Sequence, residues 1–318
     1  MNGWIILDKP LGLGSTQAVG AVKRVCREAG LGKVKVGHGG TLDPLASGVL
    51  PIALGEATKL CGRMLDASKV YAFTIAFGTE TGGLDAEGEV VASSHVRPTL
   101  AEVEAVLSRF TGAIEQVPPA YSAIKIDGQR AYDLARKGEA VEMKARGVTI
   151  FSLRHVGLDP ASIAAPAEWT PDQVRGDEDG AERLDSVTLT AHVSKGTYIR
   201  SLARDIAHAV GTVGHVTMLR RTKAGPFDLE QAISLDKLNA FGQGAAQSEV
   251  ILPLEAGLVD IPALNLSPEA AGAIRQGRVW TGVATDDGLY WGRDDDNRPI
   301  ALIEALAGTL KVVRGFNL

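Results

Sequence analysis

Residues 37–48 read Gly-His-Gly-Gly-Thr-Leu-Asp-Pro-Leu-Ala-Ser-Gly, a stretch with four glycines, one imidazole and one carboxylate. Glycine has no Cβ, so such a chain turns sharply and lets a ligand approach its backbone closely. One interpretation is structural: Asp43 caps a short helix that Pro44 begins. The other is a mobile loop that presents the carboxylate of Asp43 to a bulky substrate. The stretch alone leaves both open, so the flanking sequence has to decide.

The flanking sequence alternates between strand-like and helix-like patterns. Over 69–78, Tyr71 and every second residue after it are apolar, and this alternation is typical of a strand. Thr99 and Glu102 form a capping box, which predicts a helix over 100–110. Similar signals predict strands at 3–9, 89–92, 187–193, 289–291, 300–306 and 310–314, a helix capped by Ser15 or Thr16 and ended by Gly30, and helices at 130–137, before Gly211 and at 267–277.

Two stretches resemble connections more than packed elements. Residues 158–186 are rich in Ala, Pro, Asp and Glu, so we expect an exposed loop with little fixed structure. Residues 240–248 contain mostly Gly, Gln, Ala and Ser and predict a linker. The tail beyond the linker has its own helix and strand patterns, which indicates a second domain from residue 250.

The composition limits the class of protein. The chain has 318 residues, of which 45% are hydrophobic and 22% charged, which is ordinary for a globular protein. Two cysteines, Cys26 and Cys61, make neither a disulfide framework nor a four-ligand zinc site, so we expect the cytoplasm. The apolar run Trp4–Leu7 is short and is followed by Asp8 and Lys9, so we expect no signal peptide. We also expect no membrane span.

The charge is unevenly distributed. The formal net charge is −5, yet residues 1–70 contain nine Lys or Arg against five Asp or Glu, and residues 195–223 contain six against one. Acidic residues concentrate at 158–185, with eight against two basic residues. The local field decides whether phosphates are attracted, so this distribution permits a polyanionic partner.

Several motifs follow one another along the chain. They are L-D-K-P at 7–10, G-H-x-G-x-L-D-P-x-A-x-G at 37–48, K-x-Y at 69–71, Y-S-A-x-K at 121–125, K-G-T-Y-I-R at 195–200 and L-R-R at 219–221. In this order they resemble the tRNA pseudouridine-55 synthases of the TruB family, and the resemblance covers nearly the whole chain. It implies an α+β catalytic domain over 1–245 with a mixed, largely antiparallel central sheet, flanking helices and loops, and 158–186 as an acidic insertion. A small PUA-like, β-rich RNA-binding domain is implied over 250–318.

The activity implied by this resemblance is isomerisation of uridine-55 in the T loop of tRNA to pseudouridine. The bond from ribose C1′ to N1 breaks, the base rotates, and C1′ joins C5. By resemblance Asp43 is the catalytic aspartate, and one carboxylate suits a nucleophile or a stabiliser of sugar charge. Arg200 would face it and favour its ionised form. Asp85 would lie on the other side of Arg200, although the family has T-D-T-x-D where this chain reads Thr81-Gly82-Gly83-Leu84-Asp85.

The resemblance also implies residues that hold the substrate. Tyr71 would stack on the extruded uracil and its hydroxyl would handle the C5 proton; stacking contributes about 1–3 kcal/mol per base. Its structural interpretation is an aromatic at the edge of the core. His38 would fill the space left by the flipped uridine. Tyr198 and Leu219 would line the uridine pocket, although a buried apolar role explains Leu219 almost as well.

The expected partner is the T arm of tRNA, with no metal and no organic cofactor, and we expect a monomer. Lys9 and Lys125 are candidate phosphate contacts, together with the basic residues at 220, 221 and 223. Gly39 stands where the family usually has threonine, so we expect a more mobile loop.

Two other functions remain open at this stage. A non-catalytic tRNA-binding protein or folding chaperone would need only the tail and the basic segments. A base-excising glycosidase would release free uracil. If the chain is an isomerase, Asp43 could attack C1′, add to the base ring or steady a glycal intermediate.

Overall fold

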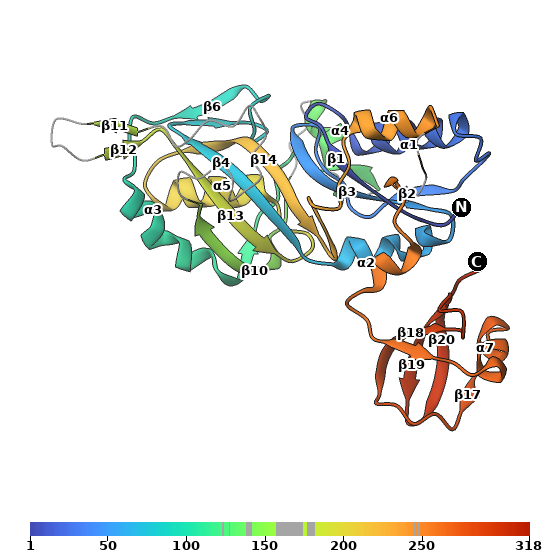
Figure 1. Cartoon of the computed structure of the whole chain (residues 1–318). Helices are drawn as coiled ribbons and strands as arrows, with labels where there is room; N and C mark the ends of the chain where they lie inside the picture. The colour runs from blue at the N-terminus through green and yellow to red at the C-terminus, as the bar shows by residue number, and fades with distance from the viewer. Residues whose placement is uncertain are drawn as a thin grey trace. The chain divides into compact units, whose positions relative to one another are not determined.

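The computed structural model describes residues 1–122, 124–126, 128–137, 142–156, 174–176, 182–244, 246 and 249–318. The chain forms two compact units, and Figure 1 labels many of their helices and strands. The first unit consists of Met1–Asp43, Val49–Leu65 and Ala224–Leu318, and the second of Pro44–Gly48 and Asp66–Lys223.

The second unit is built on a mixed sheet with the strand order β7-β10-β13-β4-β14, and the start of β3 lies beside β14. The β7–β10, β10–β13 and β13–β4 pairs are antiparallel, whereas β14 and β3 are parallel. The α+β class with a mixed, largely antiparallel sheet is therefore confirmed. The strands are β3 (Ala46–Leu54), β4 (Lys69–Phe77), β7 (Gly112–Gln116), β10 (Arg146–His155), β13 (Ser186–Val193) and β14 (Gly214–Ala224).

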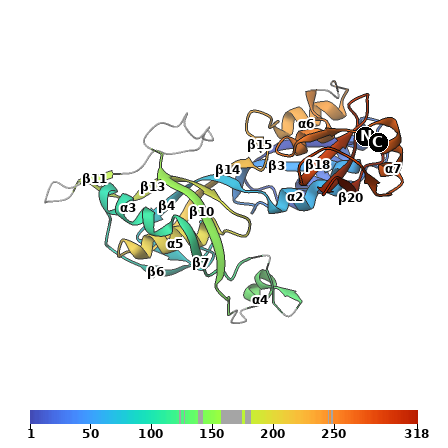
Figure 2. The same cartoon turned by 90° about the horizontal axis from the view of Figure 1, so that it is seen from below.

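Helices α3 (Leu100–Leu107) and α5 (Ile199–Ala209) cover one face of this sheet (Figures 1 and 2). The apolar side of α5 packs on alternate residues of β4 and β13 in one buried core. Alternate side chains of a strand point to the same face, so Tyr71 lies on the helix-covered face with Phe73. The predicted capping box is present, because Thr99 and Glu102 exchange hydrogen bonds at the start of α3.

Shorter elements complete the second unit. The segment that we predicted as a loop over 158–186 contains a paired strand couple, β11 (Val174–Gly176) and β12 (Glu182–Leu184). Backbone pairing satisfies the polar groups of these strands, which composition alone does not reveal. Residues 158–173 and 177–181 of the predicted loop lie outside the described residues. The other elements are β5 (Thr79–Thr81), β6 (Val90–Ser93), η2 (Ser108–Phe110), β8 (Lys125–Ile126), β9 (Gln129–Arg130) and α4 (Ala131–Arg136).

In the first unit, β1 (Gly3–Lys9) and β2 (Val36–His38) lie on either side of the end of β3. Helices α1 (Ser15–Glu28) and α6 (Leu235–Gly242) pack against each other (Figure 1). Helix α6 covers the first three residues of the stretch predicted as a linker. The other elements that precede the C-terminal sheet are η1 (Gly55–Leu60), α2 (Cys61–Asp66), β15 (Phe227–Asp228) and η5 (Leu254–Leu258).

Helix α1 corrects one predicted detail. We expected Ser15 or Thr16 to cap the helix, but Gly14 is the N-cap residue and its N–H donates to the side chain of Gln17 at 2.7 Å. Ser15 is already the first helical residue, and its hydroxyl bonds to the backbone of Leu42 instead.

The C-terminal part of the first unit is β-rich, as expected. Five strands form one sheet in the order β16-β18-β19-β20-β17, and α7 packs on it. Leu302 and Phe316 from this part also share a buried core with Trp4 of β1. Among the described residues, no helix is long and apolar enough to cross a membrane. The elements are β16 (Ala263–Asn265), α7 (Pro268–Arg275), β17 (Trp280–Thr281), β18 (Gly288–Arg293), β19 (Pro299–Leu306) and β20 (Thr309–Gly315).

Candidate active site

The glycine-rich stretch forms a short strand and an irregular loop. Strand β2 ends at His38, which pairs with Ile52 of β3. The chain is then irregular through Asp43, and Pro44 and Leu45 make a turn into β3. Asp43 therefore caps no helix, and its side chain lies at a partly exposed position. This leaves a carboxylate on a loop, which is the arrangement that the second interpretation requires.

Two contacts shape the start of this loop. His38 is partly exposed, and its Nδ1 accepts a hydrogen bond from the N–H of Gly40 at 3.4 Å. Gly39 donates to the carbonyl of Pro51 at 2.8 Å, and a Cβ added to it would lie 2.5 Å from Cβ of Met64. Met64 is buried, so this close packing argues against the extra mobility that we expected from the missing side chain.

Arg200 is held by three acceptors in the second unit. It is the second residue of α5, and its side chain is 8% exposed. Its Nη1 donates to Oδ2 of Asp85 at 3.0 Å and to the carbonyl of Gly83 at 2.9 Å, and its Nη2 donates to the carbonyl of Tyr121 at 3.0 Å. The ion pair with Asp85 that the resemblance implies is thus present, despite the altered motif around Asp85.

The turn that carries Asp85 has an uncommon backbone. Leu84 has a φ of +58°, although it is not glycine, and its side chain is buried. Hydrogen bonds hold the turn on both sides, because Leu84 accepts from the N–H of Val216 and Thr81 donates its hydroxyl to the carbonyl of Asp85. A residue with φ > 0 persists only where its surroundings determine it. The turn therefore holds the carbonyl of Gly83 and the carboxylate of Asp85 in fixed positions, where both accept hydrogen bonds from Arg200.

A residue that sequence reasoning missed connects β7 to the start of α5. Gln116 is 1% exposed, and its Oε1 accepts a hydrogen bond from the N–H of Tyr198 at 2.8 Å. Tyr198 is the N-cap residue of α5, two positions before Arg200. Tyr71 and Leu219 are partly buried against the core that α5 helps to form. The structure thus gathers Tyr198, Arg200 and Asp85 through α5 and its contacts in the second unit.

Known proteins identify the family of the chain. The profile described as "TruB family pseudouridylate synthase (N terminal domain)" matches residues 27–199, and "tRNA pseudouridylate synthase B C-terminal domain" matches residues 200–259. The chain belongs to the TruB family. Two relatives are called tRNA pseudouridine synthase B. The one from Novosphingobium aromaticivorans is 67% identical to this chain, and the one from Zymomonas mobilis is 55% identical. These alignments cover 100% of this chain and 98% and 96% of the relatives.

Solved structures support the fold of this TruB-family chain. An H/ACA ribonucleoprotein bound to a substrate RNA containing 2′-deoxyuridine has a chain with a TM-score of 0.70 at 23% identity, covering 99% of this chain and 85% of the other. The archaeal complex of Nop10 and Cbf5 gives 0.67 at 23% identity, with 99% and 86% covered. At this identity the likeness concerns the fold alone.

Lys9, from the first motif of this TruB-family chain, does not face solvent. It is 0% exposed, and its Nζ donates to the carbonyls of Leu13 at 2.7 Å and Pro10 at 3.0 Å. Its ammonium group therefore holds the turn before α1, which corrects our expectation of a surface phosphate contact. Lys125 lies on β8, and its side chain is outside the described part of the structure.

Lys69, in the K-x-Y motif, is a second buried lysine whose role the sequence did not suggest. It is 7% exposed, and its Nζ donates to the carbonyl of Ala67 at 2.6 Å. Burial, followed by the positive charge of Arg221, lowers the pKa of Lys69 to about 8. The two basic residues of the L-R-R motif are also buried, with Arg220 8% and Arg221 1% exposed, so they do not present open phosphate contacts.

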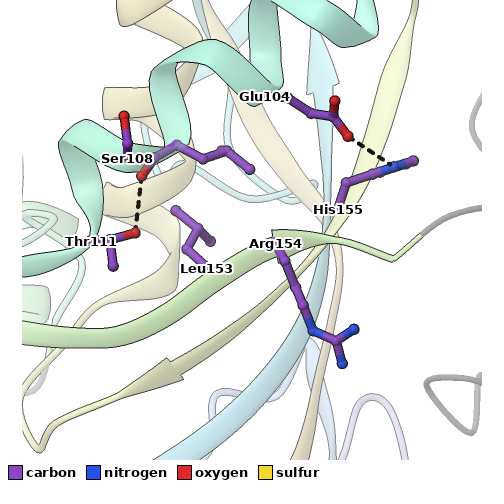
Figure 3. Close-up of a pocket in the computed structure, with 7 residues that line it drawn as sticks. Glu104, Ser108, Thr111, Leu153, Arg154 and His155 are labelled. Carbon is purple, nitrogen blue, oxygen red and sulfur yellow. Dashed lines mark hydrogen bonds and ion pairs between the residues drawn. The ribbon is translucent and has the colours of Figure 1, made fainter.

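One open pocket in the second unit is separate from the TruB motifs. It has a volume of about 630 Å³ and lies between α3 and β10 (Figure 3). Figure 3 shows the carboxylate of Glu104 directed at the ring of His155, with 3.9 Å between Oε1 and Nδ1. None of the predicted site residues lines this pocket, so it is not the candidate active site. The lining residues are Glu104, Leu107, Ser108, Thr111, Leu153, Arg154 and His155.

Proposed function

We propose that this chain converts uridine-55 in the T loop of tRNA to pseudouridine. The observation that carries the proposal is the arrangement around Arg200, where residues of three separate segments, 81–85, 121–125 and 195–200, meet. A buried guanidinium held by Asp85, Gly83 and Tyr121 is fixed in direction before substrate binds. The family membership and the full-length relatives called tRNA pseudouridine synthase B support the same substrate class.

Asp43 is proposed as the catalytic group. Its carboxylate acts on the sugar or the base while the C1′–N1 bond breaks and the C1′–C5 bond forms. The base leaves C1′ through N1, turns, and returns through C5, so C5 loses a proton and N1 gains one. Attack at C1′, addition to the ring and a glycal intermediate all need one carboxylate, and all three satisfy this balance.

The other residues are assigned supporting roles. Tyr71 stacks on the extruded uracil and handles the C5 proton, and Tyr198 and Leu219 line the pocket for the base. His38 occupies the space that the uridine leaves in the T loop. Arg200 directs the catalytic carboxylate, with Asp85 balancing the charge of the guanidinium.

Replacement of Asp43 by Asn tests the function. We expect tritium release from C5-labelled uridine in tRNA to stop, while tRNA affinity stays within a few-fold of wild type. A tRNA with cytidine at position 55 serves as the substrate control. A variant that still turns over would remove Asp43 from the mechanism, and an inactive wild type that binds tRNA would favour a tRNA-binding or folding protein. Release of free uracil would indicate a glycosidase.

Four wider expectations belong to the same proposal. We expect residues 250–318 to act as a PUA-like RNA-binding domain, the chain to act as a monomer, and the reaction to need neither metal nor organic cofactor. The cytoplasm remains our predicted location. One assay tests two of these expectations, the monomer and the absence of a metal. We expect a monomeric fraction from gel filtration to keep full activity in the presence of EDTA.

A further inference from the structure

The hydroxyl of Ser15 makes a reciprocal pair of hydrogen bonds with the residue before Asp43. Ser15 Oγ donates to the carbonyl of Leu42 at 2.9 Å, and the N–H of Leu42 donates to Ser15 Oγ at 2.8 Å. Ser15 is 4% and Leu42 4% exposed, so water does not compete for these bonds. Both backbone groups of Leu42 are therefore bound by one side chain.

This contact determines the orientation of the next peptide. The carbonyl of Leu42 and the N–H of Asp43 belong to one planar peptide unit. By binding this carbonyl, the hydroxyl of Ser15 holds the plane of the peptide that joins Leu42 to Asp43, and this fixes the position of the Asp43 Cα. Since the Leu42 N–H is bound as well, the preceding peptide plane is also held. Few backbone rotations then remain that could redirect the carboxylate.

The hydroxyl itself is attached to a rigid element. Ser15 is the first residue of α1, a helix of 14 residues whose apolar side is buried in the first unit. The other end of the loop is held at Gly39, through its hydrogen bond to Pro51 and its close packing on Met64. The segment between the anchors at Gly39 and Leu42 is two residues long, 40–41, and both of its ends are held by buried contacts. Asp43 directly follows the Leu42 anchor.

We propose that Ser15 is the positioning residue for the catalytic aspartate, and that the loop bearing Asp43 is set in place before tRNA binds. This inference rests on the proposed function of Asp43. Ser15 touches neither substrate nor reacting atoms in this proposal, and it acts through Leu42. Catalytic groups need placement within a fraction of an ångström, and a 1 Å displacement can reduce a rate by about 100-fold.

The test compares Ser15→Ala with Thr16→Ala, a control that removes the exposed hydroxyl of the next residue of the same helix. We expect Ser15→Ala to reduce the single-turnover rate of pseudouridine formation by about 10- to 100-fold with tRNA affinity within about threefold. Thr16→Ala should leave both unchanged. Amide hydrogen exchange in the free protein should become faster at Leu42 in Ser15→Ala only.

Either of two results with Ser15→Ala would overturn the proposal. One is a Ser15→Ala enzyme whose Leu42 amide exchanges faster while its single-turnover rate equals that of Thr16→Ala. The other is a loss of tRNA affinity that accounts for the whole loss of activity. If Ser15→Ala does not fold, Ser15→Cys keeps the shape with a weaker hydrogen-bonding group, and an unchanged rate there would equally count against the proposal. A wild-type protein that forms no pseudouridine would instead overturn the proposed function. The rate of amide exchange at Leu42 in Ser15→Ala would then still show whether Ser15 holds the loop.

Discussion

Replacement of Asp85 by Asn tests whether charge holds Arg200 in place. Asparagine keeps the shape and one acceptor oxygen, so the change mainly removes the negative charge from a pair with 3.0 Å between Arg200 Nη1 and Asp85 Oδ2. Two unit charges at such a distance attract by about 5 kcal/mol at an effective dielectric constant of about 20. Removal from water offsets much of this attraction. With the two side chains 8% and 20% exposed, we expect a loss of about 1–3 kcal/mol, between values for surface and buried pairs.

The assay is urea unfolding at pH 7, followed by the single-turnover rate. A matched control is Asp66→Asn, because Asp66 pairs with Lys195 at 2.8 Å but both side chains are mostly exposed. We expect the control to keep the wild-type unfolding midpoint, since water and salt screen an exposed pair. Asp85→Asn should also turn over more slowly, because an unbalanced guanidinium is less firmly directed. Wild-type stability together with a wild-type rate in Asp85→Asn would refute the reasoning.

Lys69→Met should stabilise the protein at pH 7. In the folded protein the pKa of Lys69 is lowered to about 8. Between this pH and the higher pKa of Lys69 in the unfolded chain, the unfolded state binds more protons than the folded state. The stability of the wild type therefore rises with pH over this range. The gain from Lys69→Met should therefore shrink from pH 7 to pH 10 in urea unfolding; an equal gain at both pH values would contradict it. Gly39→Thr should lose about 1–3 kcal/mol through the clash with Met64. A Gly39→Thr variant with the thermal unfolding midpoint of the wild type would contradict this expectation. Thr99→Ala should lose about 1 kcal/mol, because it removes the N-cap that bonds to Glu102; an unchanged urea midpoint would show that the cap is dispensable.

The buried lysines change how the family motifs are understood. Lys9 was a predicted phosphate contact, whereas the sequence suggested no role for Lys69 in the K-x-Y motif. The structure instead uses the ammonium of Lys9 to hold two carbonyls before α1, and it buries Lys69 on β4. From the sequence alone a lysine is predicted to lie at the surface, because most lysines in folded proteins are exposed. Its burial depends on which carbonyls the fold brings to it.

The sequence by itself determined the local elements and the family. The alternation over 69–78 predicted β4, and the pair Thr99 and Glu102 predicted the start of α3, because a strand period and a capping box are complete within a few residues. The order of the motifs was enough to indicate the TruB family. These signals do not depend on the rest of the chain.

Only the tertiary structure decided the contacts around the candidate catalytic residues. Arg200 bonds to the carbonyl of Gly83, 117 positions away, and Ser15 bonds to Leu42, 27 positions away. Such pairs depend on the order of strands in the sheet and on where each helix packs, and no short window contains that information. The hydrogen bonds form because a buried polar group without a partner costs about 1–3 kcal/mol. The chain therefore folds so that distant carbonyls meet these buried donors.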